Sequence, residues 1–473
     1  MVLRRPDRRS RPAPIYLHIG GPSTGTTYLQ RLMYANRDGL GRTGYLLPAP
    51  WRDVVLATHD ALSFGRPTGH KNDLTRAAGG RWDRLAEELT AHGGKGTVVS
   101  MEFLCWARPA AAERIISSLG DAEVHVVLTV RDTAAVLRSQ WQTNCRNGEE
   151  VPLRRMLWGL RQIVKEDGEP ASRPERMIHR GMGIPTMIDT WVPLVGADRV
   201  HVVTVPLRSD DPDLLWKRFA GVVGIKPSRC RERAVQSNAS LGLPSSELMR
   251  LLNIELGPVR RTDYLRTMKV LLARDILSER ADQERKVTLN RPGRNLAARW
   301  NDRIRGAIST SGVDLVGSLD DLPVTRAGKD VPAELETPTD EELLFAAAWA
   351  RKGLVEAIGD LEDRIAKLRE DQAYVGSAPA VGPGAEDSDQ QDDDDAADDG
   401  PDDGPDDDRA DDDPDDVGLD PRARLDRQLR DRTPEVGLAL TEIAGLVRQA
   451  MPLGAELAEL RAAGTSPAPS RDH

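Results

Sequence analysis

The clearest chemistry in this sequence belongs to a glycine-rich loop, Gly20–Thr27, which reads G-G-P-S-T-G-T-T. The apolar run Ile15–Ile19 precedes the loop and predicts a strand, and the pattern from Thr26 onward is that of a helix. A loop of this kind presents successive backbone N–H groups, and the positive end of a helix dipole, to one point in space. The sequence therefore predicts a binding site for an anion such as phosphate or sulfate.

The spacing within the loop disfavours an ordinary ATP or GTP site. Gly20–Thr27 fits the template G-x-x-x-x-G-K-[ST] of nucleotide-binding P-loops, except that Thr26 stands where the template has lysine. A P-loop kinase or hydrolase would need that lysine and an aspartate that binds magnesium. This class of enzyme is an alternative that the sequence supports poorly.

Two further stretches carry residues suited to catalysis or to anion binding. In T-V-R-D-T-A-A-V-L-R-S-Q-W-Q, Asp132 can cap a helix, and Ser139 then lies ~10 Å along that helix, so that Arg131 and Ser139 can hold one phosphate from two sides. Glu102 follows a second apolar run in V-V-S-M-E-F-L. Partial burial would raise the pKa of this carboxyl group, so that its carboxylate could act as a base and accept a proton. Alternatively, the carboxylate could form a salt bridge with Arg108.

The elements that must position these residues alternate along the chain. Strands are expected at Ile15–Ile19, Gly96–Ser100, Glu123–Val130 and Val200–Val205. Helices are expected at Thr26–Asn36, Arg81–His92, Ala110–Leu119, from Thr133, at Pro185–Val195, Pro212–Val223, Pro244–Gly257, Asp263–Arg280 and Leu296–Ser309. This alternation predicts an α/β fold with a parallel sheet, in which ligands bind beyond the carboxyl ends of the strands. The glycine loop, Glu102 and Arg131 should therefore converge.

The loop resembles the 5′-phosphosulfate loop of sulfotransferases that use 3′-phosphoadenosine 5′-phosphosulfate (PAPS), written P-K-[ST]-G-T-[ST] and here P-S-T-G-T-T from Pro22 to Thr27. Arg131 and Ser139 match the family's 3′-phosphate motif, R-[DN]-x-x-x-x-x-x-S. Together with A-E-V-H-V-V-L-T-V-R-D and R-V-H-V-V-T-V-P, these motifs resemble a bacterial, actinomycete-type branch of the family over about Pro14–Pro323. The main departure is Ser23, which replaces the family's lysine.

The resemblance implies a P-loop sulfotransferase-like α/β fold, PAPS as co-substrate and no metal. The residues it implies for the 5′-phosphosulfate are Gly21, Pro22, Ser23, Thr24, Gly25, Thr26 and Thr27. Arg131 and Ser139 would hold the 3′-phosphate, and Glu102 occupies the slot where cytosolic members of the family have a catalytic histidine and other branches a glutamate. The family's R-K-G element has only a faint candidate, N-R-P-G-R at Asn290–Arg294, where a plain loop is expected.

The missing lysine leaves two interpretations open. As an enzyme, the chain would transfer a sulfuryl group to a hydroxyl or amine of a small molecule, glycan or lipid, and turnover would be slow because Ser23 carries no charge. As a non-catalytic scaffold, it would bind PAPS or its desulfated product without reaction. The histidines compete poorly for the role of base, because His18 and His125 lie inside expected strands and are better explained as hydrogen-bonded core residues.

Charge and cysteine content exclude some classes of protein. The net charge of −10 arises from residues 386–416, which hold nineteen Asp or Glu and one Arg, so the remainder is mildly basic at about +8. That excess is too small for a nucleic-acid surface. The three cysteines, Cys105, Cys145 and Cys230, predict reduced, buried thiols rather than disulfides or a zinc site. With neither a leader nor a transmembrane segment in the sequence, the expected location is the cytoplasm.

The outer parts of the chain differ in composition from the central region. A basic disordered arm is expected at 1–13, the sulfotransferase-like domain at 14–323, with irregular loops over Gly39–Gly80, and a long helix at 339–372. Thr339 and Glu342 should cap the long helix, whose apolar stripe could form a coiled coil. A disordered acidic linker at 377–416 and a C-terminal helix within 421–463 should follow. The last helix could pack on the long helix, on a partner or on a second copy, and deleting it together with the linker should leave the domain stable.

Overall fold

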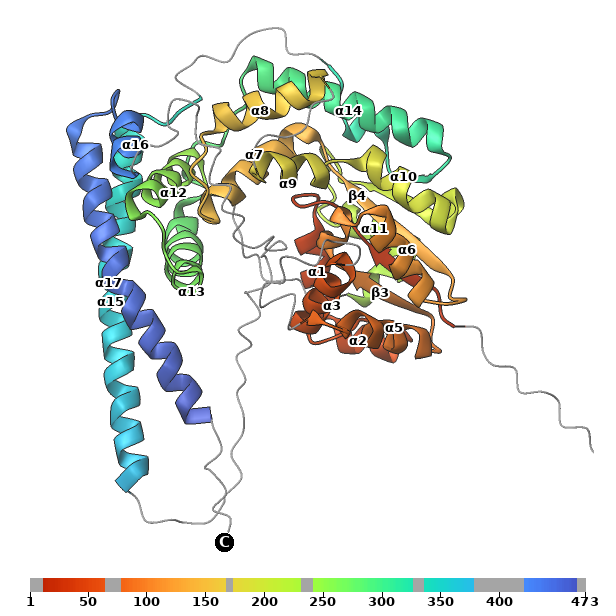
Figure 1. Cartoon of the computed structure of the whole chain (residues 1–473), viewed down its shortest axis with the longest axis horizontal. Helices are drawn as coiled ribbons and strands as arrows, with labels where there is room; N and C mark the ends of the chain where they lie inside the picture. Colours follow the sequence, from red (N-terminus) through yellow and green to blue (C-terminus); the bar gives the residue numbers. More distant parts are fainter. Residues whose placement is uncertain are drawn as a thin grey trace, which may run out of the picture.

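The structure is a computed structural model that describes residues 12–63, 78–166, 173–230, 241–325, 336–377 and 421–465. Figure 1 shows an α/β body and, beside it, a layer of long helices formed by the C-terminal part of the chain. The expected basic arm at 1–13 lies almost wholly outside the described residues, and so does the acidic linker at 377–416. The fold class predicted from the alternation of strands and helices is confirmed.

The sheet has six parallel strands in the order β2-β3-β1-β4-β5-β6. They are β1 (Ile15–His18), β2 (Tyr45–Leu46), β3 (Gly96–Ser100), β4 (Val124–Val130), β5 (Val200–Thr204) and β6 (Asp314–Val316). The four expected strands are present and adjacent, and the short edge strands β2 and β6 were not expected. Because β3, β1 and β4 are neighbours, their carboxyl ends lie side by side.

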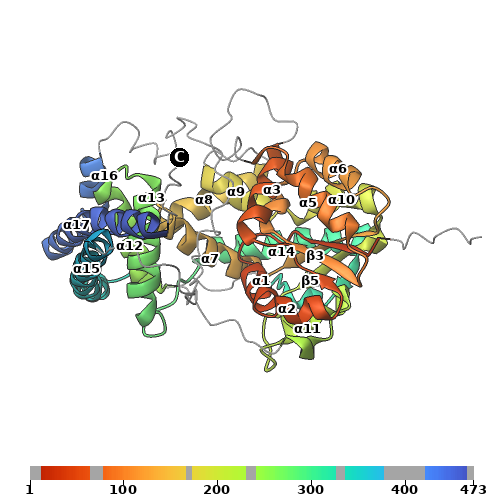
Figure 2. The ribbon, with the colours of Figure 1, turned by 90° about the horizontal axis from the view of Figure 1, so that it is seen from below.

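Helices cover both faces of the sheet, and Figure 2 shows them on either side of the strands. Those of the α/β body are α1 (Thr26–Ala35), α2 (Arg37–Arg42), α3 (Trp51–Ser63), α5 (Arg81–Ala91), α6 (Pro109–Ser118), α7 (Thr133–Arg146), α8 (Leu153–Glu166), α9 (Arg173–Gly181), α10 (Ile184–Val195), α11 (Leu214–Val223) and α14 (Arg291–Ser311). Leu29, Leu40 and Phe219 of α1, α2 and α11 form one core with one side of the strands. The larger core on the opposite side includes α3, α5, α6, α7, α10 and α14.

Two expectations about loops are wrong. The stretch Gly39–Gly80 was expected to be irregular, but it contains most of α2, all of β2 and the thirteen-residue helix α3, whose apolar side packs against the larger core; residues 64–77 lie outside the described ranges. The segment Asn290–Arg294 was expected to be a plain loop, but it begins α14. Asn290 caps that helix by accepting from the Gly293 N–H at 2.9 Å, and Pro292 is favourable in a first helical turn, where its missing N–H has no partner to lose.

The remaining helices form a layer on α7. They include α12 (Leu243–Leu256), the single turn α13 (Arg261–Asp263), the π-helical segment η4 (Tyr264–Ile276), α15 (Asp340–Ser377), α16 (Pro421–Gln428) and α17 (Pro434–Thr465). The C-terminal helix expected within 421–463, over Pro434–Leu460, is α17, and the shorter helix α16, which was not expected, precedes it. Residues Leu243–Ile254 of α12 are all buried, beneath helices that include α7, α15, α16 and α17.

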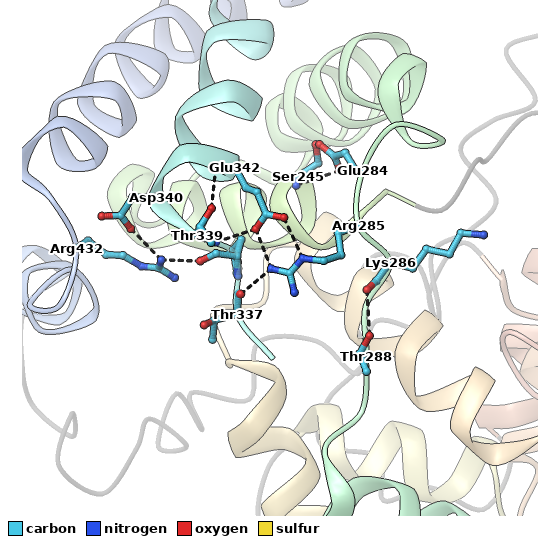
Figure 3. Close-up of polar contacts among 11 residues, drawn as sticks. Ser245, Glu284, Arg285, Lys286, Thr288, Thr337, Thr339, Asp340, Glu342 and Arg432 are labelled. Carbon is cyan, nitrogen blue, oxygen red and sulfur yellow. Dashed lines mark hydrogen bonds and ion pairs between the residues drawn. The ribbon is translucent and has the colours of Figure 1, made fainter. Parts of the chain in front are cut away.

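The long helix begins as the sequence predicts. The Thr339 N–H donates to Glu342 Oε2 at 2.8 Å, and the Glu342 N–H donates to Thr339 Oγ1 at 3.2 Å, which is a reciprocal capping box. Figure 3 shows that Glu342 also accepts two hydrogen bonds from Arg285, and that Asp340 pairs with Arg432 in the segment before α17. The starts of α15 and α17 are therefore fixed to each other and to the segment that leads into α14.

Helices α15 and α17 lie side by side and run parallel. Asp340 pairs with Arg432 near the start of both helices, Arg351 with Glu442 further along, and Arg369 with Glu456 near the end. The expected apolar stripe of α15 lies largely against α17 and α12 and includes Leu343, Leu354, Ile358 and Ile365. Of the alternatives for the last helix, packing on the long helix is the one found within this chain.

The expectation that this C-terminal part is loosely tethered is wrong. In α17, Leu440 and Val447 are fully buried. Below α16, Arg250 is 2% exposed and donates to Glu247 at 2.6 and 2.9 Å, to the Glu150 carbonyl and to Gln428 of α16. Removing α16 and α17 would expose this ion pair and one side of α12.

We expect Leu440→Ala to lower the free energy of unfolding by about 2–5 kcal/mol, because it opens a cavity in a packed interface. Leu438 is in the same helix but is 72% exposed, so Leu438→Ala should change the free energy of unfolding by less than about 0.5 kcal/mol. Urea unfolding of both variants measures the difference. Equal stability of the two variants would contradict the packing of α17 on α12 and α15.

Candidate functional site

The glycine loop is shaped by close contacts that only glycine permits. A Cβ atom on Gly20 would lie 1.8 Å from Thr129 Oγ1, and one on Gly21 would lie 2.0 Å from the Gly181 carbonyl oxygen at the end of α9. Gly25 has a φ of +90° and Ser23 a φ of +66°. A positive φ is uncommon for a residue other than glycine and is often found at functional sites.

The backbone N–H groups of the loop have no acceptor in the described chain. Those of Gly20, Gly21, Ser23, Thr24 and Gly25 donate no hydrogen bond among the described residues. Helix α1 starts directly after them without a side-chain cap and with no acidic residue in its first turn. Oriented N–H dipoles at a helix N-terminus create positive potential. These N–H groups are therefore available to an anion, and anion binding by the loop stays a prediction.

The three loop threonines differ in their surroundings. Thr24 is 5% exposed, and its hydroxyl donates to the Gly21 carbonyl at 2.5 Å and contacts Thr129 Oγ1 at 2.9 Å. Thr26 is buried as well, at the first position of α1, whereas Thr27 is exposed. The hydroxyl of Thr24 thus holds the loop in shape, which leaves its backbone N–H as the group that can contact an anion.

A buried chain of hydrogen bonds supports the loop from below. His18 Nδ1 lies 2.7 Å from Ser100 Oγ, and His18 Nε2 lies 3.1 Å from Thr129 Oγ1. Because the Gly21 carbonyl can only accept, Thr24 donates to it, Thr129 donates to Thr24, and His18 donates to Thr129 through Nε2–H. Complete burial lowers the pKa of His18 to about 3, so the ring is neutral. His18 is the hydrogen-bonded core residue that its place in a strand predicted.

Arg131 and Ser23 meet across the site. Arg131 Nη1 donates to the Ser23 carbonyl at 3.1 Å, and Gln140 Nε2 donates to Ser23 Oγ at 3.0 Å. Both partners come from the end of β4 and the helix α7 that follows it. They hold Ser23 in its left-handed conformation. The prediction that Arg131 converges on the loop is confirmed by this contact, and Gln140 is a residue that the sequence analysis missed.

The start of α7 is fixed independently of the loop. Asp132 accepts from the N–H groups of Ala134 and Ala135, which is the cap predicted from the sequence, and also from Asn301 Nδ2 at 2.9 Å. Ser139 lies further along α7, half-buried, and its side chain forms no hydrogen bond with the described residues. Ser139 directly precedes Gln140, the residue of α7 that donates to Ser23 of the loop.

Glu102 stands at the end of β3, as predicted, and is 6% exposed. It begins the short helix η1 (Glu102–Trp106). Gln30 of α1 donates through Nε2 to Glu102 Oε2 at 2.7 Å and to the Ser100 carbonyl at 3.2 Å. This places the carboxylate beside the helix that the glycine loop begins. The alternative of a salt bridge with Arg108 is not found in the described part of the chain.

The end of α9 packs on the same region. Gly181 contacts Gly21 and Pro22, and Arg180 Nη2 donates to the Trp106 carbonyl at 2.8 Å. Phe103 stacks on Trp106 with ring centroids 5.5 Å apart. Neither α9 nor Arg180 was singled out in the sequence, because the contacts depend on tertiary packing and leave no local pattern.

The cysteines are the remaining reactive side chains considered in the sequence. Cys105 and Cys145 are buried free thiols, as expected, and Cys230 is partly exposed. Burial raises the pKa of Cys230 to about 11. The described residues contain no group of three or more His, Cys, Asp or Glu side chains arranged to hold a metal ion. None of the described helices is long and apolar enough to span a membrane.

Comparison with known proteins adds little to this geometry. No protein-family model matches the chain, and no curated protein matches it. Among solved structures, a sulfotransferase from Alicyclobacillus acidocaldarius is similar, with 16% sequence identity and a TM-score of 0.34 over 48% of this chain and 86% of that chain. A similarity this low does not show what this chain does.

Proposed function

We propose that this protein is a sulfotransferase that transfers a sulfuryl group from PAPS to a hydroxyl or amine of an acceptor molecule. The observation that carries the proposal is the loop Gly20–Thr27, whose free N–H groups lie next to the guanidinium of Arg131. The resemblance of the loop and of the Arg131–Ser139 spacing to the two PAPS motifs supports the choice of donor. The lysine of an ATP or GTP loop is absent at Thr26.

In the proposed reaction, the acceptor oxygen attacks sulfur in line with the bond between sulfur and the bridging oxygen of the phosphosulfate. That bond breaks, its electron pair goes to the leaving phosphate, and the acceptor proton goes to Glu102. The products are the sulfated acceptor and 3′-phosphoadenosine 5′-phosphate (PAP). The N–H groups of the loop stabilise the charge that grows on the leaving oxygen, an interaction that is strongest in the transition state.

Each proposed residue has one role in this reaction. The loop, Gly21–Thr27, binds the 5′-phosphosulfate through its N–H groups; Arg131 and Ser139 bind the 3′-phosphate. Glu102 is the base, held by Gln30. Carboxylates with this role must lie within hydrogen-bonding reach of the proton they accept. The acceptor would therefore bind on the side of the loop nearest β3.

We expect PAP to raise the melting temperature of the protein, and ATP with magnesium to leave it unchanged. At 100 times its Kd, a ligand that binds only the folded state stabilises that state by about 2.7 kcal/mol. Differential scanning fluorimetry with the two nucleotides measures the difference, and 5′-AMP serves as a control without the 3′-phosphate. Equal stabilisation by PAP and ATP would contradict the proposed donor.

Ser23 favours a second candidate function, a non-catalytic protein that binds PAP or PAPS. If the chain is an enzyme limited by its missing lysine, Ser23→Lys should raise the rate of sulfuryl transfer, or of slow PAPS hydrolysis, at least ~10-fold, with little change in donor affinity. Ser23→Met has a similar length without the charge and should give no such rise. Single-turnover rates with radiolabelled PAPS distinguish the enzyme from the non-catalytic protein. A Ser23→Lys variant that binds PAPS but does not turn it over would support the non-catalytic function.

A further inference from the structure

We propose that His125 and His201 form an acid-sensitive pair, which holds one proton between two carboxylates and separates when it takes up a second. The pair lies near the amino-terminal ends of β4 and β5, whereas the glycine loop follows the carboxyl end of β1. Along β4, His125 is four residues, or about 13 Å, from Thr129, which contacts the loop. The inference is therefore independent of the proposed function.

Four side chains form a continuous polar row across the sheet. His125 Nδ1 lies 2.9 Å from His201 Nε2. On the outer sides of the two rings, Glu123 Oε1 lies 3.2 Å from His125 Nε2, and Asp314 Oδ2 lies 2.7 Å from His201 Nδ1. The strand register produces this row, because His201 is paired with Asp314 of β6 and with Val127 of β4, two residues from His125. All four ring nitrogens therefore have a polar partner.

The number of protons in the row sets its charge. An ionised carboxylate can only accept a hydrogen bond, so each of the three contacts needs one proton from a ring. Two neutral imidazoles carry two protons between them, which leaves one contact without a hydrogen bond. One extra proton completes all three hydrogen bonds and gives the pair a charge of +1, which lies between two negative groups.

A second extra proton has no acceptor in the row. With both rings charged, two N–H groups and two like charges would face each other across 2.9 Å, and the contact between the rings would have to open. Burial is the main cause that lowers the pKa of His125. The hydrogen bond to Glu123 opposes this shift, and the positive charges of His201 and Arg199 lower the pKa further. The charge on His125 is therefore the one that the folded protein resists.

The other titratable and charged groups around the pair are Tyr16 of β1, Arg199 of η2 (Ala197–Arg199) and the two carboxylates. The Tyr16 ring stacks on His125 with ring centroids 5.0 Å apart, and burial raises the pKa of its hydroxyl, which stays neutral while histidine titrates. The side chains of His125 and His201 are 15% and 12% exposed, so protons from water can reach a pair that is partly desolvated.

The lowered pKa of His125 gives the stability effect its sign. A neutral His125 favours the folded state above about pH 6.5, and this contribution is lost as the pH falls through the lowered pKa of the folded protein. Opening of the pair would also release the contact that connects His201 with Asp314 of the edge strand β6. Acid should therefore weaken the amino-terminal edge of the sheet.

The titration of the two rings tests the pair directly. We expect nuclear magnetic resonance of the full-length protein, with ¹⁵N in its eight histidine rings, to show that His201→Gln raises the titration midpoint of His125 by at least about 1 pH unit. Glu123→Gln should lower this midpoint, because it removes a negative hydrogen-bond acceptor. Glu113→Gln, on the exposed side of α6, is the matched control and should not move it.

Two of the eight histidine signals in wild type should titrate in linked steps, a result that needs no variant. Single, unlinked steps for all eight would overturn the inference, and so would a His125 midpoint that is the same with and without His201.

Melting temperatures measure the consequence for the fold. Between about pH 7.5 and about pH 5.5, wild type should lose more thermal stability than His125→Gln, because glutamine has no proton to take up. Equal losses in the two proteins would show that the pair does not make the fold sensitive to acid.

Discussion

Replacing Glu102 by glutamine is expected to lower acceptor-dependent sulfuryl transfer by about 10²-fold to 10⁴-fold, the usual contribution of a general base. The amide is isosteric, and its oxygen can still accept the hydrogen bond from Gln30, so the loop and its donor affinity should be unaffected. What the amide cannot do is take up a proton. The expected result is therefore a loss of rate without a loss of PAP binding.

Transfer of label from radiolabelled PAPS to a panel of phenols, alcohols and amines measures this effect under single-turnover conditions. Glu113→Gln, on the exposed side of α6, is the matched control and should retain full activity. A Glu102→Gln variant that keeps most of the wild-type rate would show that another group accepts the proton. A variant that instead loses PAP binding would assign Glu102 to the support of the loop.

The second large effect is expected for Gly21→Ala. The added methyl group would lie 2.0 Å from the Gly181 carbonyl oxygen, a backbone atom that cannot rotate away. Either the loop or the end of α9 must move, and overpacking of this kind typically costs about 1–3 kcal/mol. Because the loop N–H groups have to converge on one anion, we expect PAP to bind at least about 10-fold more weakly.

Gly41→Ala is the matched control, since a methyl group there meets no atom within 4 Å. Titration with PAP gives the Kd of each variant. The difference between the two Kd values separates the effect of a distorted loop from the general effect of replacing a glycine. If Gly21→Ala binds PAP as tightly as Gly41→Ala does, the loop is not the phosphate cradle. Thermal unfolding without ligand shows whether any loss at Gly21 is confined to the site.

The parts of the fold that follow from local pattern were predicted well. The buried strands β1, β3, β4 and β5 are short apolar runs between turn residues, and this pattern needs no knowledge of the rest of the chain. Caps are equally local, which explains why the roles of Asp132 at α7 and of Thr339 with Glu342 at α15 could be predicted. The convergence of the loop and Arg131 followed from the rule that parallel strands end at the same edge.

What the sequence did not reveal depends on partners distant along the chain. The contact of Gln140 with Ser23 joins residues 117 positions apart, and the hydrogen bond of His18 with Thr129 spans 111. Helix α3 does not follow from the pattern of Gly39–Gly80, because the proline and glycine residues on both sides of it favour loops. The sequence of the C-terminal helices does not show how firmly they are held. Their packing depends on α12, whose residues Leu243–Ile254 are all buried, and this cannot be read from α16 or α17 alone.

The parallel course of α15 and α17 sets a requirement on the chain between them. A helix of 38 residues is about 57 Å long, and a parallel partner can begin only after the chain has returned over roughly that distance. An extended chain covers at most about 3.3–3.6 Å per residue, so the return needs about 16 or 17 residues. Residues 378–420 exceed this requirement more than twofold. Deleting about half of this connection would therefore leave enough residues to cover the distance, whereas a tight turn in its place would separate the two helices.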